Sequence, residues 1–175
     1  MRPALILVAA LAAAGCATTS GLAPSSTRSG FDGARVVAIP GHGAACAGVV
    51  CPGLGVQWSD RTPTAAIVTV HVFNELRGIV GAQLAIDGRI VTLRAMPALT
   101  NFSRPGDPLK ESRRDFTASL ADVRAVAQAQ RAWIRVQTTD GTIESAIVDD
   151  STDSKALHAL RRFLAEVDAE PPPSR

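Results

Sequence analysis

The stretch VGAQLAIDGRIVTLRA, residues 80–95, predicts more about the fold than any other segment of this 175-residue chain. Its centre, Asp87-Gly88, favours a type I′ hairpin turn, because Asp and especially Gly tolerate positive φ. If Ile86 lies opposite Arg89, one register places the apolar residues of both arms on the same face. These residues are Val80, Ala82, Leu84, Ile86, Val91, Leu93 and Ala95. We therefore expect an antiparallel hairpin that covers a hydrophobic core.

A second hairpin is predicted further along the chain, with its turn at Asp140-Gly141 and Thr139 opposite Thr142. This register gathers Ile134, Val136, Thr138, Ile143, Ser145 and Ile147 on one mostly apolar face.

A further strand is predicted over residues 64–73, where apolar and mixed positions alternate with a period of two. A shorter β-rich run covers residues 35–39, and Pro40-Gly41-His42-Gly43 should end it. Residues 55–58 have the pattern of another short strand.

Two helices are indicated by capping and periodicity. Ser119 and Asp122 have the spacing of a capping box, which predicts a helix from there to about Gln130. The second helix follows from apolar residues at helical spacing, namely Ala156, Leu157, Leu160, Phe163, Leu164 and Val167. Asp149, Asp150 and Asp153 precede it and lack the Gly and terminal Glu of an EF-hand calcium loop. This order of elements predicts the α+β class, with a mainly antiparallel sheet built from hairpins and two helices packed on one face.

Between the first hairpin and the first helix, residues 96–115 contain Pro97, Pro105 and Pro108 and are expected to form a long irregular connection. The connection carries a local group of basic residues, which are Arg104, Lys110, Arg113 and Arg114, with acidic residues interspersed. A solvated loop and a contact site for an envelope polyanion are both compatible with this pattern.

Cys46 and Cys51 are close in sequence, and in an oxidising compartment such a pair most often forms a disulfide. The alternative is a metal site, because His42, Cys46 and Cys51 follow one another as H-x3-C-x4-C and His71 is available from a later strand. This spacing matches no recognised zinc or copper pattern, so the disulfide is the leading interpretation.

Several functional classes lack their sequence signatures. The chain contains no G-x-S-x-G, H-E-x-x-H, Walker or GxGxxG motif. A histidine-based enzyme would have to use His71 or His158 together with residues distant in sequence. Since 18 basic residues nearly balance 16 acidic ones, no global field favours nucleic acid. We expect no enzymatic activity, no cofactor and no nucleic-acid partner.

The first residues have the features of a targeting signal. Arg2 precedes a short apolar segment, and the run Leu11-Ala12-Ala13-Ala14-Gly15-Cys16 resembles the lipobox of bacterial lipoprotein precursors. The resemblance implies a signal peptide over residues 1–15 and a mature protein that begins with a lipidated Cys16. Ala17, instead of Asp, implies transfer to the outer membrane of a Gram-negative bacterium, facing the periplasm. The body also resembles small envelope lipoproteins of such bacteria in its general build.

The expected organisation follows from this address. Residues 16–33 are rich in Ser and Gly and should be a flexible tether, residues 34–168 a single domain, and residues 169–175 a disordered tail. The sequence thus predicts a lipid-anchored envelope protein that acts as a non-enzymatic interaction or structural module, with the membrane and another envelope protein as partners. The alternative is a metal- or small-ligand-binding lipoprotein that uses the loop of His42, Cys46 and Cys51.

Overall fold

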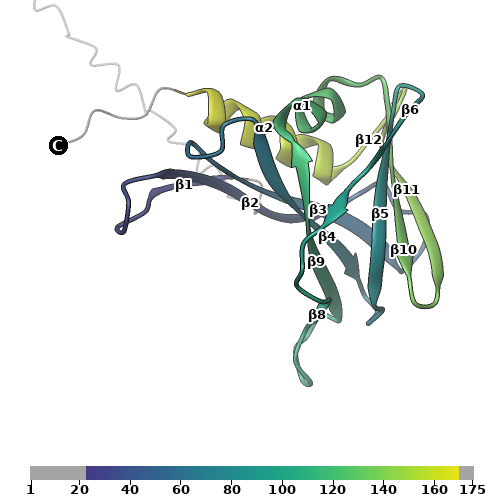
Figure 1. Cartoon of the computed structure of the whole chain (residues 1–175). Helices are drawn as coiled ribbons and strands as arrows, with labels where there is room; N and C mark the ends of the chain where they lie inside the picture. The colour runs from purple at the N-terminus through teal and green to yellow at the C-terminus, as the bar shows by residue number, and fades with distance from the viewer. Residues whose placement is uncertain (1–22, 170–175) are drawn as a thin grey trace, which may run out of the picture.

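The hairpin around Asp87-Gly88 has the predicted register, because Ile86 pairs with Arg89 and Leu84 pairs with Val91. Both turn residues have positive φ, 46° at Asp87 and 88° at Gly88, as a type I′ turn requires. The structure is a computed structural model, and it describes residues 23–169. Figure 1 shows the arrangement of its strands and helices.

The strands are β1 (Ser25–Arg28), β2 (Arg35–Gly43), β3 (Cys51–Ser59), β4 (Ala65–Phe73), β5 (Ile79–Ile86), β6 (Arg89–Thr92), β7 (Arg94–Ala95), β8 (Asn101–Phe102), β9 (Glu111–Ser119), β10 (Arg131–Thr138), β11 (Gly141–Asp149) and β12 (Thr152–Asp153). The helices are α1 (Leu120–Gln128) and α2 (Lys155–Asp168). Mostly antiparallel strands with two helices confirm the α+β class.

The strands form two sheets. Sheet A has the order β1-β2-β3-β4-β9-β7, with β8 also paired to β9, and sheet B has the order β12-β11-β10-β5-β6. The chain passes from β6 in sheet B to β7 in sheet A through Leu93, whose N–H donates to the carbonyl of Ala82. On the other side, a backbone bridge joins Ala45, after β2, to Ala146 of β11. The two sheets therefore meet along two corners.

One hydrophobic core lies between the sheets and extends to both helices. Alternate residues of β4 face it, as predicted, and Val70 and Val72 are fully buried. Phe116 of β9 and Phe163 of α2 are also fully buried, and burial of such a side chain stabilises a fold by about 2 kcal/mol. α2 lies against β2 and β3 and contacts α1 (Figure 1).

The helix starts follow local sequence. Ser119 is the N-cap of α1 and accepts from the N–H of Asp122, as the capping box predicts. α1 ends at Gln128, two residues earlier than expected. Ser154 caps α2, since its hydroxyl accepts from the N–H of Leu157 and donates to the carbonyl of Ile147.

The second hairpin corrects a predicted register. Thr138 pairs with Gly141 and Gln137 with Thr142, so the turn consists of Thr139 and Asp140 instead of Asp140 and Gly141. The cause lies outside the hairpin, because the N–H of Thr139 donates to the carbonyl of Gly78 and cannot pair with Thr142. The register of the hairpin shifts by two residues, so the same apolar residues stay on one face. This holds as far as a bulge opposite Ala132 and Trp133.

Three segments expected to be irregular contain strands. β2 continues through Pro40 to Gly43, because a bulge between Ile39 and His42 accommodates the proline. β9 begins at Glu111 inside the predicted connection of residues 96–115 and pairs with β4 along its whole length. Ser25–Arg28, expected within the tether, forms β1 at the edge of sheet A. Residues 16–22 of the tether and 170–175 of the tail lie outside the described residues.

Candidate functional site

The main candidate site is a cavity of about 400 Å³ on the face of sheet A that points away from the core. We call it the His71 pocket. β4 and β9 form its floor, and the chain before β8 forms one wall. It is lined by Ile39, Pro40, Gly41, Gly55, Thr69, His71, Ala98, Leu99, Asn101, Arg113, Arg114 and Asp115.

His71 is buried, with 7% of its surface exposed, although it lies on the outer face. Its Nδ1 hydrogen-bonds to the carboxylate of Glu111, two residues before Arg113 on β9. The ring stacks on Phe73 at 5.3 Å between centroids and covers Gly41 so closely that a Cβ there would overlap it. Burial lowers the pKa of His71, and the nearby Glu111 carboxylate opposes this effect. The imidazole is therefore held neutral and in a fixed orientation.

The other polar groups of the pocket are arranged along the same strands. The hydroxyl of Thr69 donates to Asp115 across 2.7 Å. The side chain of Arg113 is exposed and makes no ion pair within residues 23–169. Leu99, at the rim, is 82% exposed. The pocket thus combines a free guanidinium with an exposed apolar side chain, which are the groups that bind a carboxylate and an apolar contact of a partner.

This arrangement favours binding over covalent chemistry. A histidine oriented by a carboxylate is one half of a nucleophile–base pair. The hydroxyl that lines the pocket, that of Thr69, is directed to Asp115 instead of to His71. No other Ser, Thr or Cys lines the described pocket.

The four basic residues proposed as one contact loop are divided between the connection before β9 and β9 itself. Arg104 and Lys110 lie on the connection between β8 and β9, as expected, whereas Arg113 lies in the His71 pocket. Arg114, next along β9, has its guanidinium bonded to the carbonyl of Ile79 at 2.8 Å. Arg114 thus contacts the start of β5, although it also lines the His71 pocket beside Arg113.

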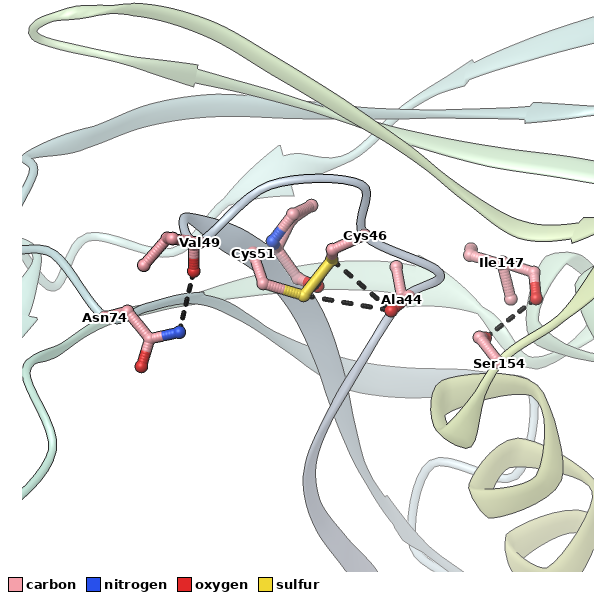
Figure 2. The surroundings of a disulfide bond; sticks show 8 residues. Ala44, Cys46, Val49, Cys51, Asn74, Ile147 and Ser154 are labelled. Atoms are coloured by element: carbon pink, nitrogen blue, oxygen red, sulfur yellow. Dashed lines mark hydrogen bonds between the residues drawn. A yellow bond between two sulfur atoms is a disulfide. The ribbon is translucent and has the colours of Figure 1, made fainter.

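Cys46 and Cys51 form a disulfide in the structure, with their Cα atoms 5.5 Å apart, a separation compatible with such a bond. Figure 2 shows the pair beside Ala44, whose N–H bonds to the carbonyl of Pro52, and Asn74, whose side chain donates to the carbonyl of Val49 at 2.7 Å. The disulfide therefore belongs to a loop that several bonds hold in place.

The residues proposed for a metal site do not converge. His42 pairs with Leu54 on β3, whereas His71 pairs with the adjacent Gly53, so the two imidazoles lie on opposite faces of sheet A. Nδ1 of His42 lies 2.8 Å from the carbonyl oxygen of Pro40. Within residues 23–169, no three His, Cys, Asp or Glu side chains form a group that could hold a metal ion.

A second hollow, of about 380 Å³, lies on the outer face of sheet B around Trp133 and Ile90 and was not anticipated from the sequence. Its charged side chains are engaged with one another, since Arg135 pairs with Glu144 and Arg131 with Asp149. For this reason the His71 pocket, where Arg113 is free, is the stronger candidate.

Sequence reasoning missed Thr69, Glu111 and Asp115 as members of the site. The available signal was the alternation of Glu111, Arg113, Asp115 and Thr117, which places all four on one face of a strand. Cys16, the predicted lipidation site, lies outside the described residues. Neither of the two described helices has the length and apolar character needed to span a bilayer.

Comparisons with known proteins assign no family to this chain. The chain matches no protein-family model, and no curated protein or solved structure is similar to it at a significant level.

Proposed function

We propose that this chain is a lipid-anchored protein of the bacterial envelope that faces the periplasm and acts by binding another envelope protein through the His71 pocket. The lipobox-like run that ends at Cys16 supports the anchor and its outer-membrane location. The Cys46–Cys51 pair supports an oxidising compartment, where disulfides persist.

The observation that carries the binding role is the position of Arg113. Its neighbours on β9, Glu111 and Asp115, have hydrogen-bond partners on β4, namely His71 and Thr69. Arg113 is thus left as a cation without an ion-pair partner among the described residues, on a rigid strand and in the same pocket as the exposed Leu99. A rigid strand holds a binding group more accurately than a loop, so this pair suits recognition of an acidic or carboxylate group next to an apolar side chain.

Site-specific photocrosslinking in intact envelopes tests the binding role. A benzoylphenylalanine at Leu99 should give one discrete adduct, and the same label in an Arg113→Glu background should lose at least four-fifths of it, as one buried charged contact is worth about 1.5–3 kcal/mol. A label at Ile90, which is 58% exposed on sheet B, is the matched control. An adduct that is absent, or equally strong from Ile90 or with Arg113→Glu, would contradict this role.

The anchor has its own test. Mature protein from the membrane fraction should carry a three-chain lipid adduct on Cys16, and Cys16→Ser should release the protein from membranes, because three acyl chains anchor far more strongly than one. An unmodified Cys16 in mature protein would contradict the anchor and leave the binding role standing.

A further inference from the structure

Exposed apolar side chains gather at one end of the molecule. Of eight large hydrophobic residues that are strongly exposed in the described chain, five lie around the ends of β8 and β9. They are Leu76, Val80, Leu99, Phe102 and Leu109, and we call them the apolar tip. Figure 1 shows β8 and the connection after it at the end of the molecule opposite to α1 and α2.

Backbone bonds bring these separate segments together. Phe102 pairs with Ser112 of β9, and the hydroxyl of Ser112 accepts from the N–H of Arg77, next to Leu76. The N–H of Ile79, next to Val80, donates to the hydroxyl of Thr100. Leu109 lies on the connection between β8 and β9. The N–H of Ser103 donates to the carbonyl of Glu111, and this bond joins the two ends of the connection. These bonds bring the segments that carry the five residues together at one end of the molecule.

Around the tip, the acidic side chains have hydrogen-bond or ion-pair partners, whereas two basic side chains have no ion-pair partner among the described residues. The acidic side chains have internal partners, since Glu75 pairs with Arg77 at 2.7 Å and Asp107 accepts from the backbone N–H of Arg104 at 2.7 Å. By contrast, the side chains of Arg104 and Lys110 make no ion pair with any described residue. Arg104 and Lys110 are therefore cations without an ion-pair partner among the described residues, and Asp107 beside them keeps its negative charge.

A polar hollow of about 520 Å³ separates the connection from β9. Its lining consists of Asn101, Phe102, Ser103, Arg104, Asp107, Glu111 and Arg113. The carboxylates of Asp107 and Glu111 are bonded to the N–H of Arg104 and to His71. Guanidinium, amide and hydroxyl groups are the donors that bind phosphate oxygens. Donor groups suited to phosphate oxygens and exposed apolar side chains are therefore adjacent at this end of the protein, and two carboxylates lie among the donors.

We propose that the apolar tip contacts the surface of a membrane that contains anionic phospholipids. Phe102 and Leu109 would enter the boundary between headgroups and acyl chains, while Arg104 and Lys110 bind lipid phosphates. A membrane fits better than a protein here, because the apolar side chains stand on an outer edge and would penetrate a soft interface. This contact is independent of the lipid anchor, but its surface shares Leu99 and Arg113 with the His71 pocket. Phe102 and Leu109 lie outside that pocket, so labels at these two residues test the membrane contact separately.

The test places an environment-sensitive fluorophore on the full chain, through Leu109→Cys or Phe102→Cys, in a Cys16→Ser background that removes lipidation. Vesicles of phosphatidylcholine with and without phosphatidylglycerol are the probes. Ile90→Cys, at 58% exposure against 64% for Leu109, is the matched control on sheet B. We expect a blue shift and increased intensity at Leu109 and Phe102 on anionic vesicles alone, and no change at Ile90.

Charge reversal completes the test. Each basic residue near an anionic surface is worth about fivefold in partitioning, so Arg104→Glu with Lys110→Glu should weaken binding by more than about tenfold. Lys155→Glu with Arg162→Glu, two exposed cations on α2, should leave it unchanged. No shift at the tip, an equal shift at Ile90, or equal shifts on both kinds of vesicle would overturn the proposal.

Discussion

The backbone N–H of Ala45 donates to the carbonyl oxygen of Ala146 across 2.8 Å, and this bond joins sheet A to sheet B at one corner. Ala45 immediately precedes Cys46, whose disulfide with Cys51 closes the loop between β2 and β3. The disulfide therefore restrains the segment that connects the two sheets.

Removal of the disulfide should loosen this corner. For Cys46→Ala with Cys51→Ala, we expect a loss of about 2 kcal/mol in the free energy of unfolding, since the bond closes a short loop. Hydrogen exchange at the Ala45 amide should accelerate, whereas the amide of Leu93 at the opposite corner should keep its protection. Unchanged exchange at Ala45 would show that the corner does not depend on the disulfide.

Gly41 should be sensitive to any added side chain, because His71 covers it. Gly41→Ala places a methyl group where the imidazole lies, and we expect a loss of about 1–3 kcal/mol measured by urea unfolding. His71→Ala removes the overlapping ring, so the double variant should be less destabilised than the sum of the two single changes. Strict additivity would mean that the ring and the methyl group do not meet.

Stability should depend on pH through His71. Burial lowers its pKa below the ordinary value of 6.5, so the unfolded chain takes up the proton first as pH falls. His71 then contributes stability above pH 6.5 that is lost as pH decreases from there toward its folded pKa, at up to about 1.4 kcal/mol per pH unit. Thermal unfolding between about pH 8 and pH 5 should show a flatter profile for His71→Gln than for the native chain. A native slope in His71→Gln would refute the assignment.

Arg35 should be essential for the end of α2. Its buried guanidinium donates to the carbonyl oxygens of Glu166 and Ala169 and pairs with the Glu166 carboxylate. Arg35→Ala leaves these groups without a donor and should cost about 3 kcal/mol in unfolding experiments. Arg124→Ala, which breaks a half-exposed pair with Asp168, should cost less than about 1 kcal/mol. Similar losses for the two variants would contradict the special role of Arg35.

Local patterns predicted those elements whose structure is determined by their own residues. The turn at Asp87-Gly88 and the cap at Ser119 were predictable, because the responsible conformations and bonds lie within a few residues. The same holds for α2, whose apolar face repeats at helical spacing.

The candidate site was predictable only in its members, not in its assembly. His71 and Arg113 both attracted attention in the sequence, but as a metal candidate and as part of a basic loop. Only strand pairing places them together, since His71 lies directly opposite Arg113 in the register of β4 and β9. β9 was not predicted, because prolines precede it and several of its residues are charged. A central strand with one solvent-facing side tolerates charged residues on that side.

The sequence by itself determined the class of the fold, the first hairpin, the cap of α1 and the proximity of Cys46 to Cys51, because each rests on short-range geometry. The tertiary structure alone decided the division into two sheets, the register of the second hairpin and the convergence of β4 with β9. These features depend on bonds between distant residues, such as Thr139 with Gly78 and Ala45 with Ala146, whose partners no local pattern specifies.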